Sequence, residues 1–412
     1  MKKHSLQELE EFQRLHKGPL DSHLNNFTSM LLKQGYAEST VNLKTRLVTN
    51  FSKWLHQKGF GINDLDEKLI DKFIELQGIQ KSVRRGNLAA LRVLLKQLRD
   101  AGVTPSPTQV IDDSGLHRIE HGFAQYLSQE RGLSQATLAY YIPLVRRFLS
   151  ELFNTDSIQL HELRPTEVSR FILRYIPTVK RSTAKLMVTS LRAFFRYLRL
   201  RGEIATDLAE FVPSVAAWRL SDIPKYLEPE QVEHLLESCD QSRSIGQRDY
   251  AVLLLLARLG LRAGEVAAMK LDDIDWEAGV LTIEGKGPRE DRLPIPHDVG
   301  EALVKYLRYG RPYCSTRRVF VRAKAPYQGF SSSVAICNIV QRALLRSKLQ
   351  PAHKGAHLLR HSLATHMLRE GATLAEVGEI LRHRLPNTTE IYTKVDMTSL
   401  RSLAQPWPGG EA

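Results

Sequence analysis

The pattern of apolar positions in the first half of the chain occurs twice. Residues 35–55 (GYAESTVNLKTRLVTNFSKWL) align with residues 132–152 (GLSQATLAYYIPLVRRFLSEL), and residues 82–102 align with residues 182–202 in the same way. Each block places its apolar residues at helical spacing, so that they form a stripe along one face of a helix. Because two separated blocks keep their register, the sequence predicts two copies of one helical module.

Glycine and proline mark the ends of the two copies. Gly102 and Gly202 follow the last apolar residue of each copy, where glycine commonly ends a helix. A Pro- and Ser-rich stretch, VTPSPTQVIDDSG, separates the copies, and prolines between residues 213 and 229 interrupt the pattern after the second. We therefore predict a first module over residues 1–105 and a second over residues 117–210.

The pattern changes to a mixture of helices and strands from about residue 225. A helix starts at EPEQVEHLLESC, and RDYAVLLLLARLGLRAGEVAAM predicts two buried helices on either side of Gly260. Alternating apolar residues on both sides of a Gly-containing turn predict a β-hairpin over residues 280–296. Further helices are predicted over about residues 297–308, 331–347, 358–370 and 374–382. The expected fold is mostly α, with helical N-terminal modules followed by a mixed α/β domain over residues 225–405 that holds a small antiparallel sheet.

The charge balance of the chain is basic. Lys and Arg number 58 against 45 Asp and Glu, a formal net charge of +13, and the pI is near 9.6. Binding to a polyanion releases counterions condensed on its phosphates, so such a chain favours a polyanionic partner. The three cysteines form no CxxC pair, which argues against a disulfide framework and against a Cys-based zinc site. No apolar run has the length of a signal peptide or a membrane span, so we expect a soluble, cytoplasmic protein without a membrane partner.

A group of side chains capable of phosphoryl chemistry lies in the last third of the chain. It consists of Arg262, Glu265, Lys286, His357, Arg360, His383 and Tyr392. A phosphodiester that reacts without a metal gathers negative charge on its oxygens, and arginine and histidine can stabilise that charge. A tyrosine can hold the phosphate covalently, provided that neighbouring cations favour the phenolate. A lysine on a turn can donate a proton to the leaving oxygen.

Three sequence boxes carry most of these residues. GLRAGEVAAMKLDDID, HLLRHSLATHMLREGA and LRHRLPNTTEIYT resemble, in order and spacing, the three signature boxes of tyrosine recombinases of the phage integrase family. The resemblance covers roughly residues 117–400 and is closest to the bacterial Xer-like branch. Within it, YLSQERGLSQATLAYYIPLVRRFL is similar to the core-binding domain of that family. The resemblance implies that residues 225–405 form the catalytic domain and that the N-terminal modules are of the core-binding type.

The resemblance also implies how a phosphate would be held. Arg262, His357 and Arg360 would bind the scissile phosphate. His383 would assist them, and Glu265 matches a supporting acidic position.

DNA strand exchange is the reaction that the resemblance implies. Tyr392 would attack the phosphate and form a 3′-phosphotyrosyl bond, and Lys286 would be the general acid. The partner would be double-stranded DNA at specific recombination sites, bound by a homotetramer on paired sites, with or without a partner recombinase. No metal, ATP or other cofactor is expected.

The chain departs from the family pattern in two places. Arg382 stands where family members usually carry glycine, a change that could perturb the local turn or add a charge that suits DNA. The first module is absent from a typical Xer-like protein, and its presence favours an integrase or transposase of a mobile element over an enzyme of chromosome or plasmid resolution.

A run of basic residues without any acidic residue extends from Val168 to Arg201. A solvated helix face normally mixes the two signs of charge, so the run predicts a surface that follows a phosphate backbone. The candidate DNA-binding residues are Arg181, Lys185, Arg192, Arg196 and Arg199. The first copy has a parallel set, which consists of Lys81, Arg84, Arg85, Arg92, Lys96 and Arg99.

Metal chemistry is the weaker interpretation of this sequence. Four histidines between residues 353 and 366 could suggest zinc, but no HExxH motif or Cys partner accompanies them. Among them, His361 and His366 are expected to pack or to hydrogen-bond locally. Three aspartates at residues 272–275 could suggest a Mg²⁺ nuclease, but a solvated turn that enters a strand explains them better.

Two other functions are compatible with the same boxes. A type IB topoisomerase uses similar residues but relaxes supercoils without exchanging DNA partners. A DNA-binding protein could retain the fold without the chemistry, although the complete set of candidate residues argues against such a silent protein. The DNA target site and the direction of the reaction cannot be predicted from the sequence.

Overall fold

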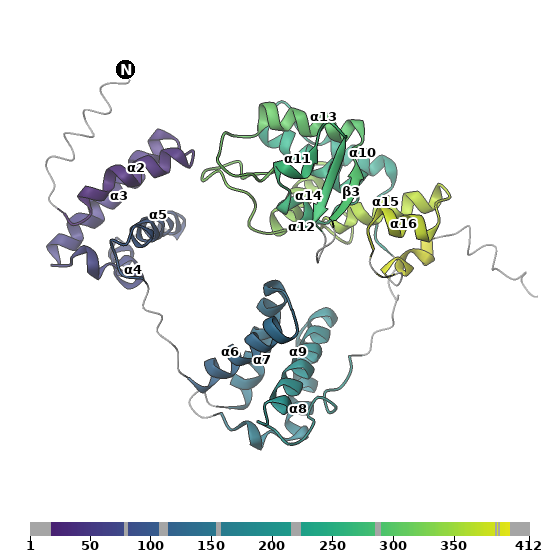
Figure 1. Ribbon diagram of the computed structural model, residues 1–412, viewed down its shortest axis with the longest axis horizontal. Coiled ribbons are helices and arrows are strands. Elements are labelled where there is room, and N and C mark those ends of the chain that lie inside the picture. The colour runs from purple at the N-terminus through teal and green to yellow at the C-terminus, as the bar shows by residue number, and fades with distance from the viewer. Residues whose placement is uncertain are drawn as a thin grey trace, which may run out of the picture. The chain divides into compact units, whose positions relative to one another are not determined.

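The computed structural model describes residues 18–77, 81–106, 114–153, 158–215, 224–284, 290–383, 385 and 388–395. Figure 1 shows the elements in chain order, coloured from purple at the N-terminus to yellow at the C-terminus. The Cα atoms cluster into two compact units, Thr108–Ser221 and the combination of Met1–Pro107 with Asp222–Ala412. Hydrophobic side chains form separate cores within residues 20–98, 123–212 and 227–359. We refer to the described residues 18–106 as the first module, 114–215 as the second module and 224–395 as the C-terminal domain.

The first module is a small helical bundle. Its helices are α2 (Leu24–Lys33), α3 (Glu38–Gln57), α4 (Glu67–Leu76) and α5 (Lys81–Asp100). The core combines Val48, Phe51 and Leu55 of α3 with Leu91 and Leu94 of α5, all of them buried. These are the two apolar stripes that the helical spacing predicts, and burying them against each other stabilises the bundle.

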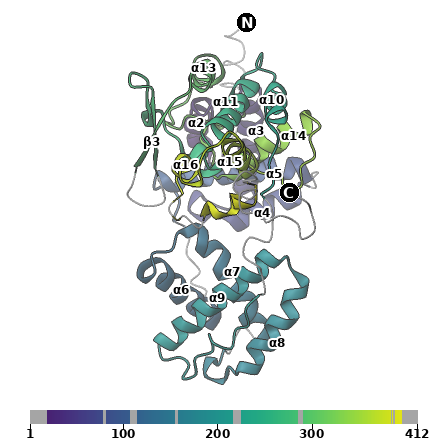
Figure 2. The ribbon, with the colours of Figure 1, turned by 90° about the vertical axis from the view of Figure 1, so that its right-hand side faces the viewer.

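The second module repeats this succession of helices. They are α6 (Gly115–Gln125), α7 (Gln135–Leu152), α8 (Pro165–Tyr175) and α9 (Arg181–Leu200). Figures 1 and 2 show α7 and α9 side by side, and Phe148 of α7 packs edge-on against Phe195 of α9. Helices α5 and α9 end just before Gly102 and Gly202, which have φ values of 68° and 75°. Glycine adopts this left-handed conformation without strain, which confirms the predicted helix ends.

The C-terminal domain is mixed α/β, as predicted. Its helices are α10 (Pro229–Glu237), α11 (Ser244–Arg258), α12 (Ala263–Ala268), α13 (His297–Lys305), α14 (Val334–Arg346), α15 (His357–Arg369) and α16 (Leu374–Ile380), and a last 3-10 turn covers Glu390–Val395. The antiparallel sheet has the order β1 (Ile274–Asp275), β2 (Val280–Glu284) and β3 (Glu290–Pro294). Leu281 faces Leu293 across the β2–β3 pair, and both side chains are buried. The sequence predicted this hairpin but not the short strand β1, because two residues are too few to show an alternating pattern.

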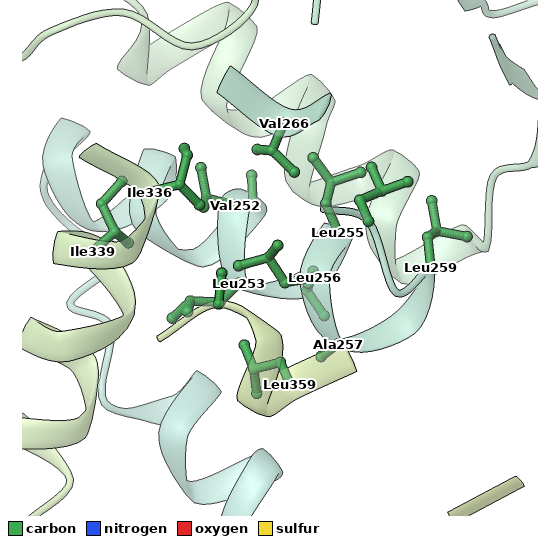
Figure 3. Close-up of a cluster of buried hydrophobic side chains, with 14 of the residues drawn as sticks. Val252, Leu253, Leu255, Leu256, Ala257, Leu259, Val266, Ile336, Ile339 and Leu359 are labelled. Atoms are coloured by element: carbon green, nitrogen blue, oxygen red, sulfur yellow. The ribbon is translucent and has the colours of Figure 1, made fainter. Parts of the chain in front are cut away.

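Helix α11 lies at the centre of the C-terminal domain. Every side chain from Ala251 to Ala257 is buried, so this helix is apolar on all its faces rather than on one stripe. Figure 3 shows its residues packed against Val266 of α12, Ile336 and Ile339 of α14 and Leu359 of α15. This core holds α12 and α15 in fixed positions, and these are the helices that begin at two of the signature boxes.

In the described part of the chain, no helix combines the length and the apolar character that crossing a bilayer requires.

Candidate active site

Arg262 is held at the N-terminus of α12. The Glu265 carboxylate accepts the backbone N–H of Arg262 at 2.8 Å and its guanidinium Nη1 at 2.7 Å. An acidic side chain three residues into a helix satisfies a free N–H of the first turn, which explains the spacing of this pair. Burial opposes the ionisation of Glu265, but the N–H of Arg262 and the charges of Arg382 and Arg262 outweigh it and lower the pKa. The Arg262 side chain remains 41% exposed and so has donors available for an anion.

Arg360 is fixed by two backbone carbonyls. Its guanidinium, in the first turn of α15, donates to the carbonyl oxygens of Gly260 and Leu381. Gly260 has a φ of 56°, and a Cβ at this position would lie 2.6 Å from the Leu381 side chain, so the close approach requires glycine. Burial, followed by the charges of Arg262 and Arg382, lowers the pKa of Arg360 to about 10. Arg360 is therefore still a cation at neutral pH.

Two histidines lie beside these arginines. His357 begins α15 one turn before Arg360, and partial burial, followed by the charges of Arg360 and Arg262, lowers its pKa. His383 follows α16, and its Nδ1 lies 2.8 Å from the Thr389 hydroxyl. Burial, followed by the same two arginines, lowers the pKa of His383 to about 4. Both rings are neutral at neutral pH and lie within electrostatic reach of one site.

Tyr392 lies beside these residues with its hydroxyl buried. The side chain is 1% exposed, and its ring stacks parallel to that of His383 with the centroids 6.5 Å apart. Burial raises the pKa of Tyr392 to about 12, although the charge of Arg360 acts in the opposite direction. We expected neighbouring cations to favour the phenolate, but in this structure desolvation has the larger effect.

His361 contacts the Tyr392 hydroxyl directly, a role that the sequence analysis did not assign to it. Its Nδ1 lies 2.7 Å from the phenolic oxygen, and burial, followed by the nearby charges of His357 and Arg360, lowers its pKa to about 4. His361 is therefore neutral at neutral pH and can accept the phenolic proton. We expected His361 to pack or to hydrogen-bond locally, but its partner lies 31 residues away in the chain. The signal that could have found it is the spacing of His357 and His361, which places both rings on one face of α15.

Some of the candidate residues are not part of this cluster. Lys286 lies outside the described residues, so the structure does not place it. The three aspartates near β1 have local partners, since Asp272 pairs with Arg317 and Asp273 and Asp275 accept backbone N–H groups. Among the residues that the structure describes, no group of three His, Cys, Asp or Glu side chains is arranged to hold a metal ion.

Arg382 points into the domain, contrary to the suggestion that its charge suits DNA. Its side chain is 5% exposed, and its Nη2 donates to the Glu265 carboxylate at 2.8 Å. The residue has a φ of 53°, a conformation that costs a non-glycine residue about 1–2 kcal/mol. The glycine that is usual at this position would avoid that cost, so the interactions of the side chain must offset it.

The basic face of α9 is divided into paired and unpaired residues. Arg192 donates to the Val212 carbonyl at 2.8 Å and to the Ser214 hydroxyl at 2.9 Å, and Arg199 pairs with Asp207. Arg181, Lys185 and Arg196 are exposed and have no side-chain partner within the described residues. Two of the five candidate DNA-binding residues are thus engaged inside the second module.

The basic residues of the first module are likewise divided into paired and unpaired residues. Along α5, Arg84, Arg92 and Arg99 form ion pairs with Glu75, Asp71 and Glu67 of α4. Arg85 and Lys96 are exposed and unpaired in the described structure, and the Lys81 side chain lies outside it. In the alignment of the two copies, Arg85 corresponds to Lys185 and Lys96 to Arg196.

Acid should destabilise this site through its buried histidines. His361 and His383 have a pKa of about 4 in the fold and an ordinary value of 6.5, so unfolding takes up protons between these pH values. The free energy of unfolding is therefore expected to be constant above about pH 6.5 and to fall as the pH drops towards 4. In His361→Asn, unfolding should take up about one proton fewer, so the free energy of unfolding should fall less steeply as the pH drops. Urea unfolding at a series of pH values would measure this slope. The same substitution at the exposed His297 is the control, and an equal change there would contradict the assignment.

Comparison with known proteins identifies two families along the chain. Residues 225–399 match the phage integrase family, and residues 121–202 match the phage integrase N-terminal SAM-like domain. An integrase/recombinase of Sinorhizobium fredii, y4rA, is 41% identical over 394 residues, which cover 95% of this chain and 96% of the relative. The tyrosine recombinase XerC of Thermodesulfovibrio yellowstonii is 31% identical over 290 residues, 68% of this chain and 92% of the relative.

Solved structures of recombinases share the fold. XerH bound to the palindromic difH substrate matches with a TM-score of 0.55 and 21% identity over 70% of this chain and 85% of that one. Lambda integrase bound to a core site matches with a TM-score of 0.53 and 19% identity over 67% of this chain and 94% of that one. The chain therefore belongs to the phage integrase family and is a tyrosine recombinase, an enzyme that breaks and rejoins DNA.

Proposed function

We propose that the enzyme cuts one DNA strand by the attack of Tyr392 on a phosphodiester, and that a 3′-phosphotyrosyl bond holds the cut end until it is rejoined. The observation that carries this proposal is the position of the Tyr392 hydroxyl, 2.7 Å from His361 and within the electrostatic reach of Arg360. A buried tyrosine without a function needs neither an imidazole acceptor nor an arginine charge beside its hydroxyl.

Each step of the cleavage has a residue suited to it. The Tyr392 oxygen forms the bond to phosphorus, and its proton passes to the neutral His361. A bound phosphate would screen the nearby cations that, with burial, lower the pKa of His361, and would so make this ring a stronger base than it is in the unbound site. Arg262, His357 and Arg360 stabilise the charge on the phosphate oxygens. The bond from phosphorus to the 5′ oxygen breaks, and Lys286 donates the proton that this oxygen takes up. This route uses only side chains of the chain and needs neither a metal nor ATP.

The hydroxyl must come within reach of the phosphorus while His361 still accepts its proton. In the present structure it is buried and protonated, and its pKa of about 12 makes it a poor nucleophile. A phosphate bound to Arg262 and Arg360 would replace part of the lost solvation and bring the hydroxyl towards phosphorus. On this proposal, the buried and protonated hydroxyl would belong to a resting state of the enzyme.

Both modules would contact the DNA backbone through their unpaired basic residues. Lys185 and Arg196 occupy the same positions in α9 as Arg85 and Lys96 in α5. Arg192 and Arg199 of α9, like Arg92 and Arg99 of α5, are engaged by partners inside their own module. Together with the C-terminal domain, the modules would form a clamp around duplex DNA. Proteins that share the fold have been solved in complex with DNA, among them the Tn1549 transposon integrase with a circular intermediate DNA.

Exchange between two DNA sites would require a tetramer on paired sites. A role in a mobile element is supported by y4rA, an integrase/recombinase that aligns with 95% of this chain, whereas the XerC alignment leaves about a third of the chain unmatched.

A plasmid with two sites taken from the DNA that flanks the gene tests the proposal. Recombinant products are expected. Relaxation of supercoils without recombinants would identify a topoisomerase instead, and binding without covalent adduct would identify a silent DNA-binding protein.

The first module should contribute to DNA affinity through Arg85 and Lys96. Each phosphate contact contributes about 0.9 to the slope of log affinity against log salt, so the variant Arg85→Ala with Lys96→Ala should flatten the slope by about two. The matched variant Arg84→Ala with Arg92→Ala removes the same charge from residues that already have acidic partners, and it should change the slope less. Deletion of residues 1–105 should also shorten the footprint on DNA. Unchanged slopes and an unchanged footprint would show that this module serves another partner.

A further inference from the structure

Arg382 lies between two acidic residues from different parts of the C-terminal domain. Its Nη2 donates to Glu265 of α12 at 2.8 Å, and its Nε lies 3.8 Å from the carboxylate of Asp291 on β3. The Nε is buried and has no hydrogen-bond partner at this distance. The side chain therefore spans the space between α12 and the sheet, and one of its donors has only an electrostatic partner.

Arg382 also shares the acid that holds Arg262. One oxygen of Glu265 accepts both the backbone N–H of Arg262 and the Nη2 of Arg382, while the other accepts the Arg262 guanidinium. The Arg382 carbonyl lies 3.4 Å from the Nη2 of Arg262. Because Asp291 also faces Arg382, the Glu265 carboxylate does not have to balance both arginines alone, and Arg382 holds Glu265 in place without withdrawing it from Arg262.

The geometry points to Arg382 as a positioning residue of the phosphate site, which fixes Arg262 through Glu265 and ties the third signature box to β3 through Asp291. It would not touch the DNA, since its side chain is only 5% exposed. This inference rests on the proposed function, because it assigns to Arg262 the binding of the scissile phosphate.

The substitution Arg382→Gly is the principal test. Glycine suits the φ of 53°, so this variant removes the side chain and retains a backbone that favours the fold. We expect about a tenfold slower formation of the covalent adduct on a nicked suicide substrate, with DNA affinity close to that of the unaltered enzyme. Arg308→Ala is the matched control, because Arg308 is an exposed arginine with no partner among the described residues. It should cleave at the unaltered rate.

The pH dependence separates positioning from a general loss of structure. Glu265 faces the cations Arg262, Arg382 and Arg360 and the ring of His357, and it lines a small cavity with Asp273 and Glu284. Removing the charge of Arg382 should raise the pKa of Glu265, so that this acid becomes protonated and releases Arg262 at a higher pH. The acid side of the pH–rate profile should move to higher pH in Arg382→Gly, whereas a less stable but otherwise unaltered site would leave it in place.

A double-mutant cycle shows whether Arg382 acts through Glu265. Glu265→Gln and Arg382→Gly should each slow cleavage, and the double variant should be about as slow as the slower single one. If the rate reduction in the double variant equals the product of the two single reductions, the inference is wrong. It is also wrong if Arg382→Gly has the rate and pH profile of the unaltered enzyme. If Arg382→Gly does not fold, Asp291→Asn is the decisive variant. It should slow cleavage when residue 382 is arginine. In the Arg382→Lys background it should have no effect, because lysine is too short to reach Asp291. Absence of any adduct with the unaltered enzyme would refute the proposed function rather than this inference.

Discussion

Tyr392→Phe is expected to abolish DNA cleavage while leaving DNA affinity nearly unchanged. The substitution removes the oxygen that would form the bond to phosphorus and retains the ring, which packs in a cluster with Leu368, Val377 and Leu381. Loss of an essential nucleophile reduces rates by about 10⁴-fold or more. It removes no cation, so phosphate contacts remain. The measurement is the yield of covalent protein–DNA adduct on a nicked suicide substrate, together with a binding titration.

The fold of this variant should be intact. Within the part of the chain that the structure describes, the lost hydroxyl has one side-chain partner, the ring of His361, so the cost to stability is that of one hydrogen bond, about 1 kcal/mol. Tyr313→Phe is the matched control, because that side chain is fully exposed and should have no effect on cleavage. An adduct that persists in Tyr392→Phe would show that another residue is the nucleophile.

Lys286→Ala is expected to slow cleavage by about 10²–10⁴-fold, the usual effect of losing a general acid. The 5′ oxygen is a poor leaving group without a proton, and the variant lacks the proposed donor. A substrate with sulfur at the bridging 5′ position should restore much of the rate, since sulfur leaves without needing a proton. Comparison of single-turnover rates on the oxygen and sulfur substrates measures the effect.

The sulfur substrate also distinguishes two roles for Lys286. Arg360→Ala, which removes a proposed phosphate ligand, should be slow on both substrates because charge on the phosphate oxygens still has to be stabilised. Equal defects of Lys286→Ala on both substrates would mean that Lys286 binds phosphate or has a structural role. Addition of EDTA should leave all of these rates unchanged, since the proposed steps involve no metal ion.

The helices and the group of candidate residues were predictable from the sequence. A helix depends on spacing within a few turns, so the stripes of α3, α5, α7 and α9 and the glycines that end α5 and α9 are visible in the sequence itself. The candidate arginines and histidines of the site could be found because each lies in a box with a recognisable order. The short strand β1 could not, because its two residues are ordered only by pairing with β2.

The partners of the charged side chains were decided by the tertiary structure alone. The sequence shows that α5 and α9 are basic, but only the packing of α4 against α5 shows that Arg84, Arg92 and Arg99 are neutralised and that Arg85 and Lys96 are not. Likewise, His361 meets Tyr392 across 31 residues, and Arg382 meets Glu265 across 117. Periodicity predicts which face of a helix is buried. The partner that a buried polar group finds depends on contacts distant in sequence, and burial then sets which of the charged groups stays ionised.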